Sequence, residues 1–134
     1  MPEASNLETV RAVYAAFDRG DLPGVLDLWS DEATLEWYGA ETIPYAGTWR
    51  GRAGAQEWLT LVATTIDFHT SERREFYAQG DTVVVVGFEK GTIRSTGRVY
   101  EQQWVSLFTL RDGAVVRYRQ FPDTAAVAAA VAEA

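Results

Sequence analysis

The N-terminal part of the chain has apolar residues at helical spacing, at Val10, Val13, Tyr14 and Phe17. Ser5 and Glu8 have the spacing of a capping box and are expected to start this helix, and Gly20 follows its last apolar residue. Asp21 is expected to cap a second, shorter helix with Pro23 in its first turn. The pattern therefore predicts two consecutive helices. The apolar face of the second comprises Val25, Leu28 and Trp29.

Residues 33–38 alternate between apolar and polar side chains, which predicts a half-buried strand. Its apolar members are Ala33, Leu35 and Trp37. Residues 39–50 follow as a loop that carries Tyr45 and Trp49. These two aromatic side chains either form a flap over an apolar interior or simply pack the loop.

The next part of the chain predicts a third helix and then four long strands. The helix runs from Gly51 to about Ile66, with Trp58 on its apolar stripe. The strands are expected over residues 68–79, 82–94, 98–110 and 114–121. Because strands of this length twist, Gly87 and Gly91 are candidate bend or bulge sites.

A last, Ala-rich helix is expected over residues 125–134, capped by Asp123 or Thr124. Helices thus cluster early and strands late, which is typical of the α+β class. We expect residues 1–134 to form one domain. In this domain a cone-shaped, curved antiparallel sheet wraps around the N-terminal helices and encloses an internal apolar pocket.

The composition of the chain limits the partners and the kinds of site that we expect. The chain of 134 residues has a formal net charge of −7, so nucleic acid is an unexpected partner. It contains no cysteine and one histidine, which argues against disulfides and metal sites. Neither a signal peptide nor a membrane-spanning apolar run is present. We therefore expect a soluble, cytoplasmic protein that needs no cofactor and does not bind membranes.

Several local sequences resemble one known superfamily in their order and spacing. They are the Gly20-Asp21 pair between two helices, the segment 31–34, the helix start at Gly51, the run 104–113 and the ending 119–124. Together they resemble the nuclear-transport-factor-two-like superfamily, which includes ketosteroid isomerases and SnoaL-like polyketide cyclases. The resemblance covers nearly the whole chain and implies a cone-shaped fold.

The resemblance also implies where catalytic groups would lie. The general base of ketosteroid isomerases corresponds to Trp37, and their oxyanion-stabilising acid corresponds to Ser106. The catalytic Asp of cyclases and related epoxide hydrolases corresponds to Gln120. The helix-one tyrosine of the isomerases falls close to Val13 and Tyr14. Since none of the first three positions is ionisable, the protein is expected to bind a ligand without ketosteroid-type proton transfer.

Strand parity and the resemblance together predict the residues that line a pocket. They are Tyr14, Phe17, Trp37, Trp58, Phe88, Gln102, Trp104, Ser106, Tyr118 and Gln120. Trp37 is interpreted either as core or as a surface that stacks on a flat ligand. Gln102 and Gln120 either bond to each other and to Ser106 or bond to a ligand, because buried amides need partners.

The candidates for acid–base chemistry are Tyr14, His69 and Tyr118, although a lone histidine near the start of a strand is more often a surface or packing residue. Arg117 and Arg119 are expected to face outward. Either Glu89 or Glu101 is the expected partner across the sheet.

Two functions remain open. The first is a pocket for an apolar small molecule, with cofactor-free isomerase, cyclase or hydrolase activity. The second is a non-catalytic ligand-binding or dimerisation module that keeps the fold without the catalytic carboxylates. A homodimer is expected in either case, because Val99, Val105 and Leu107 occupy outward positions of the sheet.

Overall fold

The computed structural model describes residues 2–132. Its elements, in order, are α1 (Pro2–Asp18), α2 (Leu22–Asp27), β1 (Trp29–Trp37), β2 (Gly47–Arg50), α3 (Gly51–Thr65), β3 (Ile66–Gln79), β4 (Thr82–Ile93), β5 (Val99–Arg111), β6 (Ala114–Pro122) and α4 (Thr124–Val131). The α+β class and all four long strands are therefore as predicted. The last four residues of the expected loop, Gly47–Arg50, form the short strand β2. The expected extension of the last helix to residues 133 and 134 lies outside the described residues.

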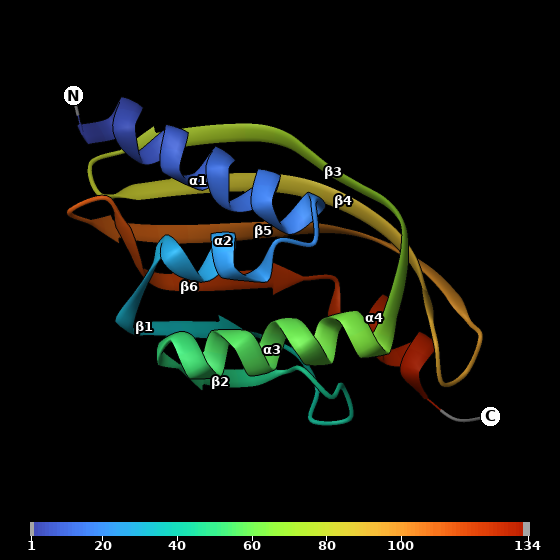
Figure 1. The fold of residues 1–134 in the computed structure, drawn as a ribbon. Coiled ribbons are helices and arrows are strands. Elements are labelled where there is room, and N and C mark those ends of the chain that lie inside the picture. Colours follow the sequence, from blue (N-terminus) through green and yellow to red (C-terminus); the bar gives the residue numbers. More distant parts are fainter. Residues whose placement is uncertain (1, 133–134) are drawn as a thin grey trace.

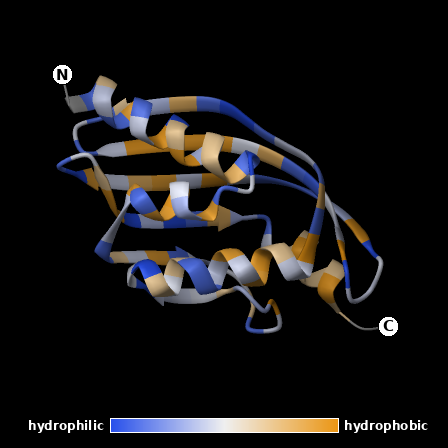
Figure 2. Ribbon diagram, viewed as in Figure 1, coloured by the Kyte–Doolittle hydropathy of each residue, from blue (hydrophilic) through white to orange (hydrophobic). Residues whose placement is uncertain are grey.

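The six strands form one curved, unclosed sheet in the order β2-β1-β6-β5-β4-β3. β1 runs parallel to β6, and the other neighbouring strands are antiparallel. Helices α1, α2 and α3 lie across one face of this sheet, and α4 lies at one end (Figure 1). Hydrophobic residues occur on these helices and on the strands behind them (Figure 2). The interior therefore lies between the helical layer and the concave face of the sheet.

The start of α1 differs from the prediction. The helix begins at Pro2, so Ser5 is not its N-cap, and the Ser5 carbonyl accepts a hydrogen bond from Thr9 Oγ1. Two side chains of the first turns bind the β3–β4 turn instead. Glu3 accepts a hydrogen bond from the Gly80 N–H, and Asn6 donates one to the Gly80 carbonyl. Proline is favoured in the first helical turn, and these long-range bonds order the residues before the expected cap.

The second helix begins as predicted but is shorter. The Asp21 side chain accepts from the Gly24 N–H at 3.0 Å, and Pro23 lies in the first turn. The helix ends at Asp27, so Trp29 belongs to β1 and not to a helical face. Asp123 likewise caps α4 by accepting from the Ala126 N–H at 3.2 Å.

The curvature of the sheet arises at β3, where the register with β4 shifts twice. One shift lies beside Gly91 and the other beside Gly87, so the bulges occur on the strand opposite these glycines. The register of β4 with β5 continues through both positions. The glycines serve close packing instead, because a Cβ on Gly87 would overlap the Trp104 indole. The bulges expected at these glycines thus lie on the neighbouring strand.

Candidate functional site

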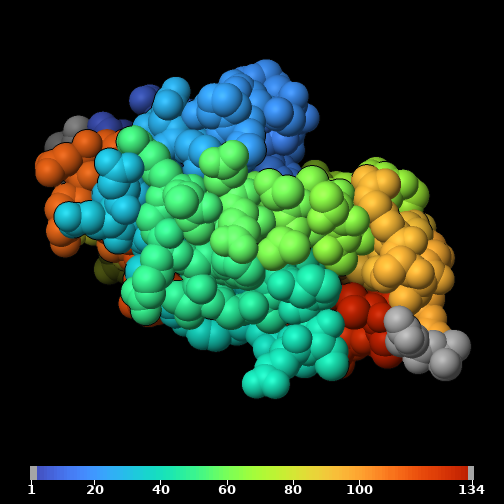
Figure 3. Space-filling view, turned by 60° about the horizontal axis from the view of Figure 1, so that its bottom comes forward, coloured from blue at the N-terminus to red at the C-terminus, as the bar shows by residue number. Residues whose placement is uncertain are grey.

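An internal cavity of about 80 Å³ lies between α1, α3 and the sheet, and we call it the inner cavity. A second cavity of about 550 Å³, the outer cavity, adjoins it near the end of α1 and the last turns of α3. Phe17, Leu59, Val62 and Phe68 line both. Figure 3 shows the outer side of this helical layer, with α1 and α2 in blue above α3 in green. The two cavities therefore adjoin each other at these shared residues.

Eight of the predicted pocket residues line the inner cavity. They are Tyr14, Phe17, Trp37, Trp58, Gln102, Trp104, Tyr118 and Gln120. These residues come from α1, α3 and three strands. The fold therefore brings together side chains that are far apart in the sequence. Tyr45 also lines the cavity and contacts Trp37 edge-to-face at 4.8 Å between ring centroids. The loop after β1 therefore contributes an aromatic side chain to the cavity wall.

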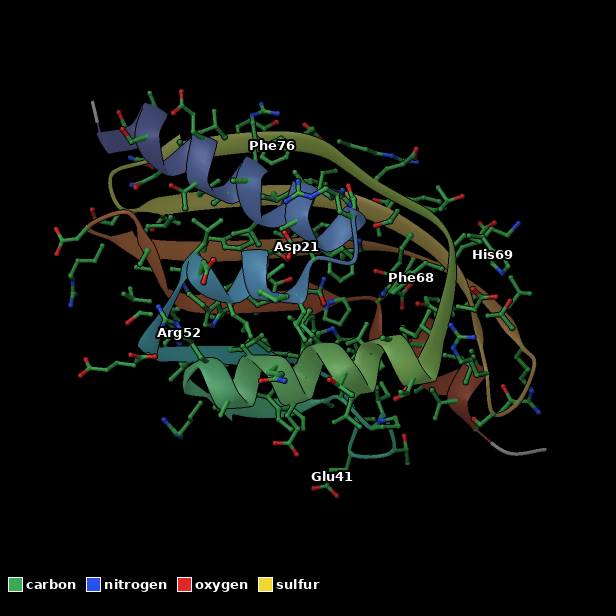
Figure 4. All side chains as sticks on the ribbon, viewed as in Figure 1. Asp21, Glu41, Arg52, Phe68, His69 and Phe76 are labelled. Atoms are coloured by element: carbon green, nitrogen blue, oxygen red, sulfur yellow. The ribbon has the colours of Figure 1, made fainter. Side chains whose placement is uncertain are left out.

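Phe88 and Ser106, both predicted pocket residues, are not among the residues that line the inner cavity, and neither is His69. Phe88 lies on the opposite face of β4, where Arg74 stacks over its ring at 4.5 Å. His69 occupies the first bulge of β3 and is within 2.6 Å of Thr92 Oγ1 on the exposed side. In Figure 4, Phe68 and His69 point to opposite sides of the strand. His69 thus has no contact with the inner cavity and cannot act as a base on a ligand bound there.

Glu89 is a site residue that the sequence analysis placed wrongly. Its side chain lines the inner cavity and is only 8% exposed, whereas it was expected to face outward toward an arginine. The Tyr100 hydroxyl donates a hydrogen bond of 2.5 Å to its carboxylate. Arg117 pairs instead with Glu36, at 3.0 Å. Every second residue of β4 is buried, and Glu89 has the same parity as Val85. That alternation is the signal that would have placed it.

The environment of Glu89 determines its protonation. Burial raises the pKa of Glu89, because a charged carboxylate loses hydration in an apolar cavity. Hydrogen bonds from Tyr100 and Gln102 act against this rise in pKa. The balance leaves a carboxyl group with a raised pKa, surrounded by aromatic rings. Carboxyl groups with pKa values raised in this way are typical of sites that carry out acid–base chemistry.

The hydroxyl groups of Tyr14, Ser106 and Tyr118 lie close together, although Ser106 itself does not line the cavity. Ser106 is completely buried, and its Oγ lies 2.9 Å from the Tyr118 hydroxyl. The Tyr14 hydroxyl is buried close to this pair, and the pKa of Tyr14 is raised, first by burial and then by the neighbouring Tyr118. Burial also raises the pKa of Tyr118. All three groups therefore stay protonated and can donate hydrogen bonds.

Glu89 and the hydroxyl groups lie at different levels of the sheet. Glu89 pairs with Gln102 in the β4–β5 register, and Ser106 lies four residues further along β5. At about 3.3 Å per residue, their backbone levels are roughly 13 Å apart. The Trp104 side chain lies between these levels.

The two glutamines do not bond to each other. The Gln102 Oε1 accepts from the Asp123 N–H at 2.9 Å, which joins the cavity to the cap of α4. Within residues 2–132 no group of three or more His, Asp or Glu side chains could hold a metal ion. In the same part of the chain no helix is both long and apolar enough to cross a membrane.

Residues 10–118 match the family described as the SnoaL-like domain. The chain belongs to this family. An NTF2-like protein from Burkholderia xenovorans LB400 is 35% identical and superposes with a TM-score of 0.90, with 97% of this chain and 98% of that chain covered. TerC, co-crystallised with polyporic acid, is 30% identical with a TM-score of 0.85, with 95% and 98% covered. An uncharacterized protein, YesE of Bacillus subtilis (strain 168), is 27% identical over 117 residues, which are 85% of this chain and 78% of YesE. The expected superfamily and its cone-shaped fold are thereby confirmed.

Proposed function

We propose that this SnoaL-like protein binds a planar, largely apolar small molecule and catalyses a cofactor-free proton transfer next to a carbonyl group. Glu89 acts as the general acid–base. The observation that carries the proposal is the buried Glu89 carboxyl in a cavity lined by aromatic side chains. TerC, which is 30% identical, was co-crystallised with polyporic acid, a small organic acid, and this supports the ligand class.

The proposed chemistry is an isomerisation that conserves all atoms. Glu89 takes a proton from the carbon beside the carbonyl, and the electron pair of the C–H bond moves toward the carbonyl oxygen. The Tyr45 hydroxyl, a buried group of the same cavity wall near Glu89, donates a hydrogen bond to the developing oxyanion. Glu89 then returns the proton to a different carbon. A raised carboxyl pKa suits both steps, because general catalysts work best when their pKa lies near the working pH.

A second candidate function is binding without catalysis. It is favoured by the three positions at which relatives of known chemistry place acids or bases, since Trp37, Ser106 and Gln120 do not ionise there. In this case Glu89 would accept a hydrogen bond from a ligand and transfer no proton.

The test compares Glu89→Gln with Glu101→Gln, an exposed carboxylate that pairs with Lys90. Isomerisation of 3-cyclohexen-1-one to the conjugated ketone is followed by ultraviolet absorbance, and polyporic acid binding by quenching of tryptophan fluorescence. We expect Glu89→Gln to lower the rate about 10²- to 10⁴-fold, the range of general acid–base help. The Glu101→Gln control should keep the wild-type rate. Binding without any wild-type turnover would favour the second candidate, and turnover that survives Glu89→Gln would contradict the assigned role.

A further inference from the structure

Five buried polar atoms of the cavity side chains have no hydrogen-bond partner within the described residues. They are Tyr14 Oη, Trp29 Nε1, Tyr45 Oη, Trp58 Nε1 and Trp104 Nε1. Buried polar groups are nearly always paired in native proteins, and an unpaired buried donor destabilises the fold. Only one other side-chain atom of residues 2–132 shares this condition, the Arg119 Nε. The concentration of such atoms around one cavity therefore indicates a common partner.

These donors lie in two groups that approach the cavity from different elements. Trp29 begins β1, Trp58 lies on α3, and Tyr45 lies in the segment between β1 and β2. The ring centroids of Tyr45 and Trp58 are 6.5 Å apart. Tyr14 of α1 and Trp104 of β5 form the other group, with ring centroids 6.1 Å apart.

The Trp104 indole packs against the backbone of β4 at Gly87. Gly87 faces it across β4 and β5, and any Cβ at position 87 would overlap the ring. The absence of a side chain at position 87 lets the Cε2–Cζ2 side of the indole lie against the strand. An indole N–H can only donate a hydrogen bond, so a partner must offer an acceptor.

We propose that the ligand is a planar molecule with acceptor oxygens at two edges, such as carbonyl or carboxylate oxygens, and not a hydrocarbon skeleton alone. One edge accepts from the Trp58–Tyr45 group and the other from the Trp104–Tyr14 group. A site built to hydrogen-bond polar atoms rejects an analogue that lacks them, because its own donors are then buried unpaired. This inference rests on the ligand-binding part of the proposed function and does not require Glu89 to be catalytic.

The test uses 1,4-naphthoquinone and naphthalene, which share a two-ring skeleton and differ in the two carbonyl oxygens. The chain has no cysteine, so the quinone meets no protein thiol. Titrations are followed through the ¹⁵N–¹H signals of the five indole groups. Trp49 is the internal control, because its Nε1 already donates to the Tyr45 carbonyl at 3.1 Å. We expect the Trp58 and Trp104 signals to move downfield with the quinone alone, and the quinone to bind at least tenfold more tightly.

A second measurement uses Tyr45→Phe, which removes one unpaired hydroxyl, with the exposed Tyr77→Phe as the matched control. Quinone affinity should fall about three- to tenfold in Tyr45→Phe, the effect of one neutral hydrogen bond, and stay unchanged in Tyr77→Phe. Equal affinity for both probes, with unmoved Trp58 and Trp104 signals, would overturn the inference and leave the pocket intact. Binding of neither probe would overturn the inference together with ligand binding at this site. Loss of turnover in Glu89→Gln is measured separately and bears only on the proposed catalysis.

Discussion

The hydroxyl of Tyr100 donates a 2.5 Å hydrogen bond to the carboxylate of Glu89, and both side chains are buried. The bond fixes the orientation of the one carboxyl group that lines the inner cavity within the described residues. It also limits how far burial can raise the pKa of Glu89, since a donor to the carboxylate favours the charged form.

The raised pKa of Glu89 predicts how stability depends on pH. Because the folded-state pKa lies above the unfolded value, Glu89 favours folding at low pH. That contribution is present below the usual carboxyl pKa of 4.5 and is lost as the pH rises through the folded-state pKa. Glu89→Gln removes this dependence. The free energy of unfolding of the variant, relative to wild type, should therefore increase from about pH 4.5 toward neutral pH. Urea unfolding across this range measures it, and a constant difference would contradict the raised pKa.

How far the sequence predicts this site is clear from β4 and β5. Alternation on β5 placed Gln102, Trp104 and Ser106 on the inner face, because the period of two holds along a regular strand. The same alternation on β4 applies to Glu89, but a carboxylate is normally exposed, and the expectation of a charge partner prevailed. Phe88 was misplaced for the complementary reason, since a large aromatic side chain was expected inside.

Other features depended on contacts that no local pattern contains. The capping box at Ser5 failed because Glu3 and Asn6 bind Gly80, more than 70 residues away. The bulges of β3 were attributed to glycines of β4, whereas the extra residues lie on the paired strand. Long-range pairing of this kind decides both cases.

The buried pair of Ser106 and Tyr118 predicts a loss of stability. Ser106→Ala removes one partner of a 2.9 Å hydrogen bond at a completely buried position and leaves the Tyr118 hydroxyl unpaired. The expected decrease in the free energy of unfolding is about 1–3 kcal/mol. Ser30→Ala is the control. The Ser30 hydroxyl accepts only a local, exposed hydrogen bond from the Glu32 N–H, so this change should affect stability much less. Denaturant unfolding measures both, and equal losses would mean that the buried pair adds nothing.

The outer face of the sheet predicts a homodimer. Val99 is 57% exposed and Phe121 43%, and Phe121 stacks on Tyr38 with ring centroids 4.8 Å apart. Burying this apolar face against a second copy would remove it from water. Sedimentation at micromolar concentration should give twice the chain mass of 14.9 kDa. Phe121→Lys should shift the protein toward monomer, whereas Gln56→Lys, which adds the same charge on exposed α3, should not. A monomeric wild type would contradict the dimer.

The contact between Gly87 and Trp104 predicts a change in the cavity. A methyl group at position 87 overlaps the indole, so Gly87→Ala must push Trp104 toward the cavity or move the strands apart. Overpacking of this kind costs about 1–3 kcal/mol of stability. The displaced indole should also shift its own ¹⁵N–¹H signal and weaken ligand binding by at least tenfold.

Gly97→Ala is the control. Position 97 has open space around it, but its φ is +72°, so an alanine there strains the backbone far from the cavity. Gly97→Ala should therefore lose stability while the Trp104 signal and ligand affinity stay as in wild type. If Gly87→Ala behaves in the same way as Gly97→Ala, with Trp104 unmoved, the glycine has no role in shaping the site.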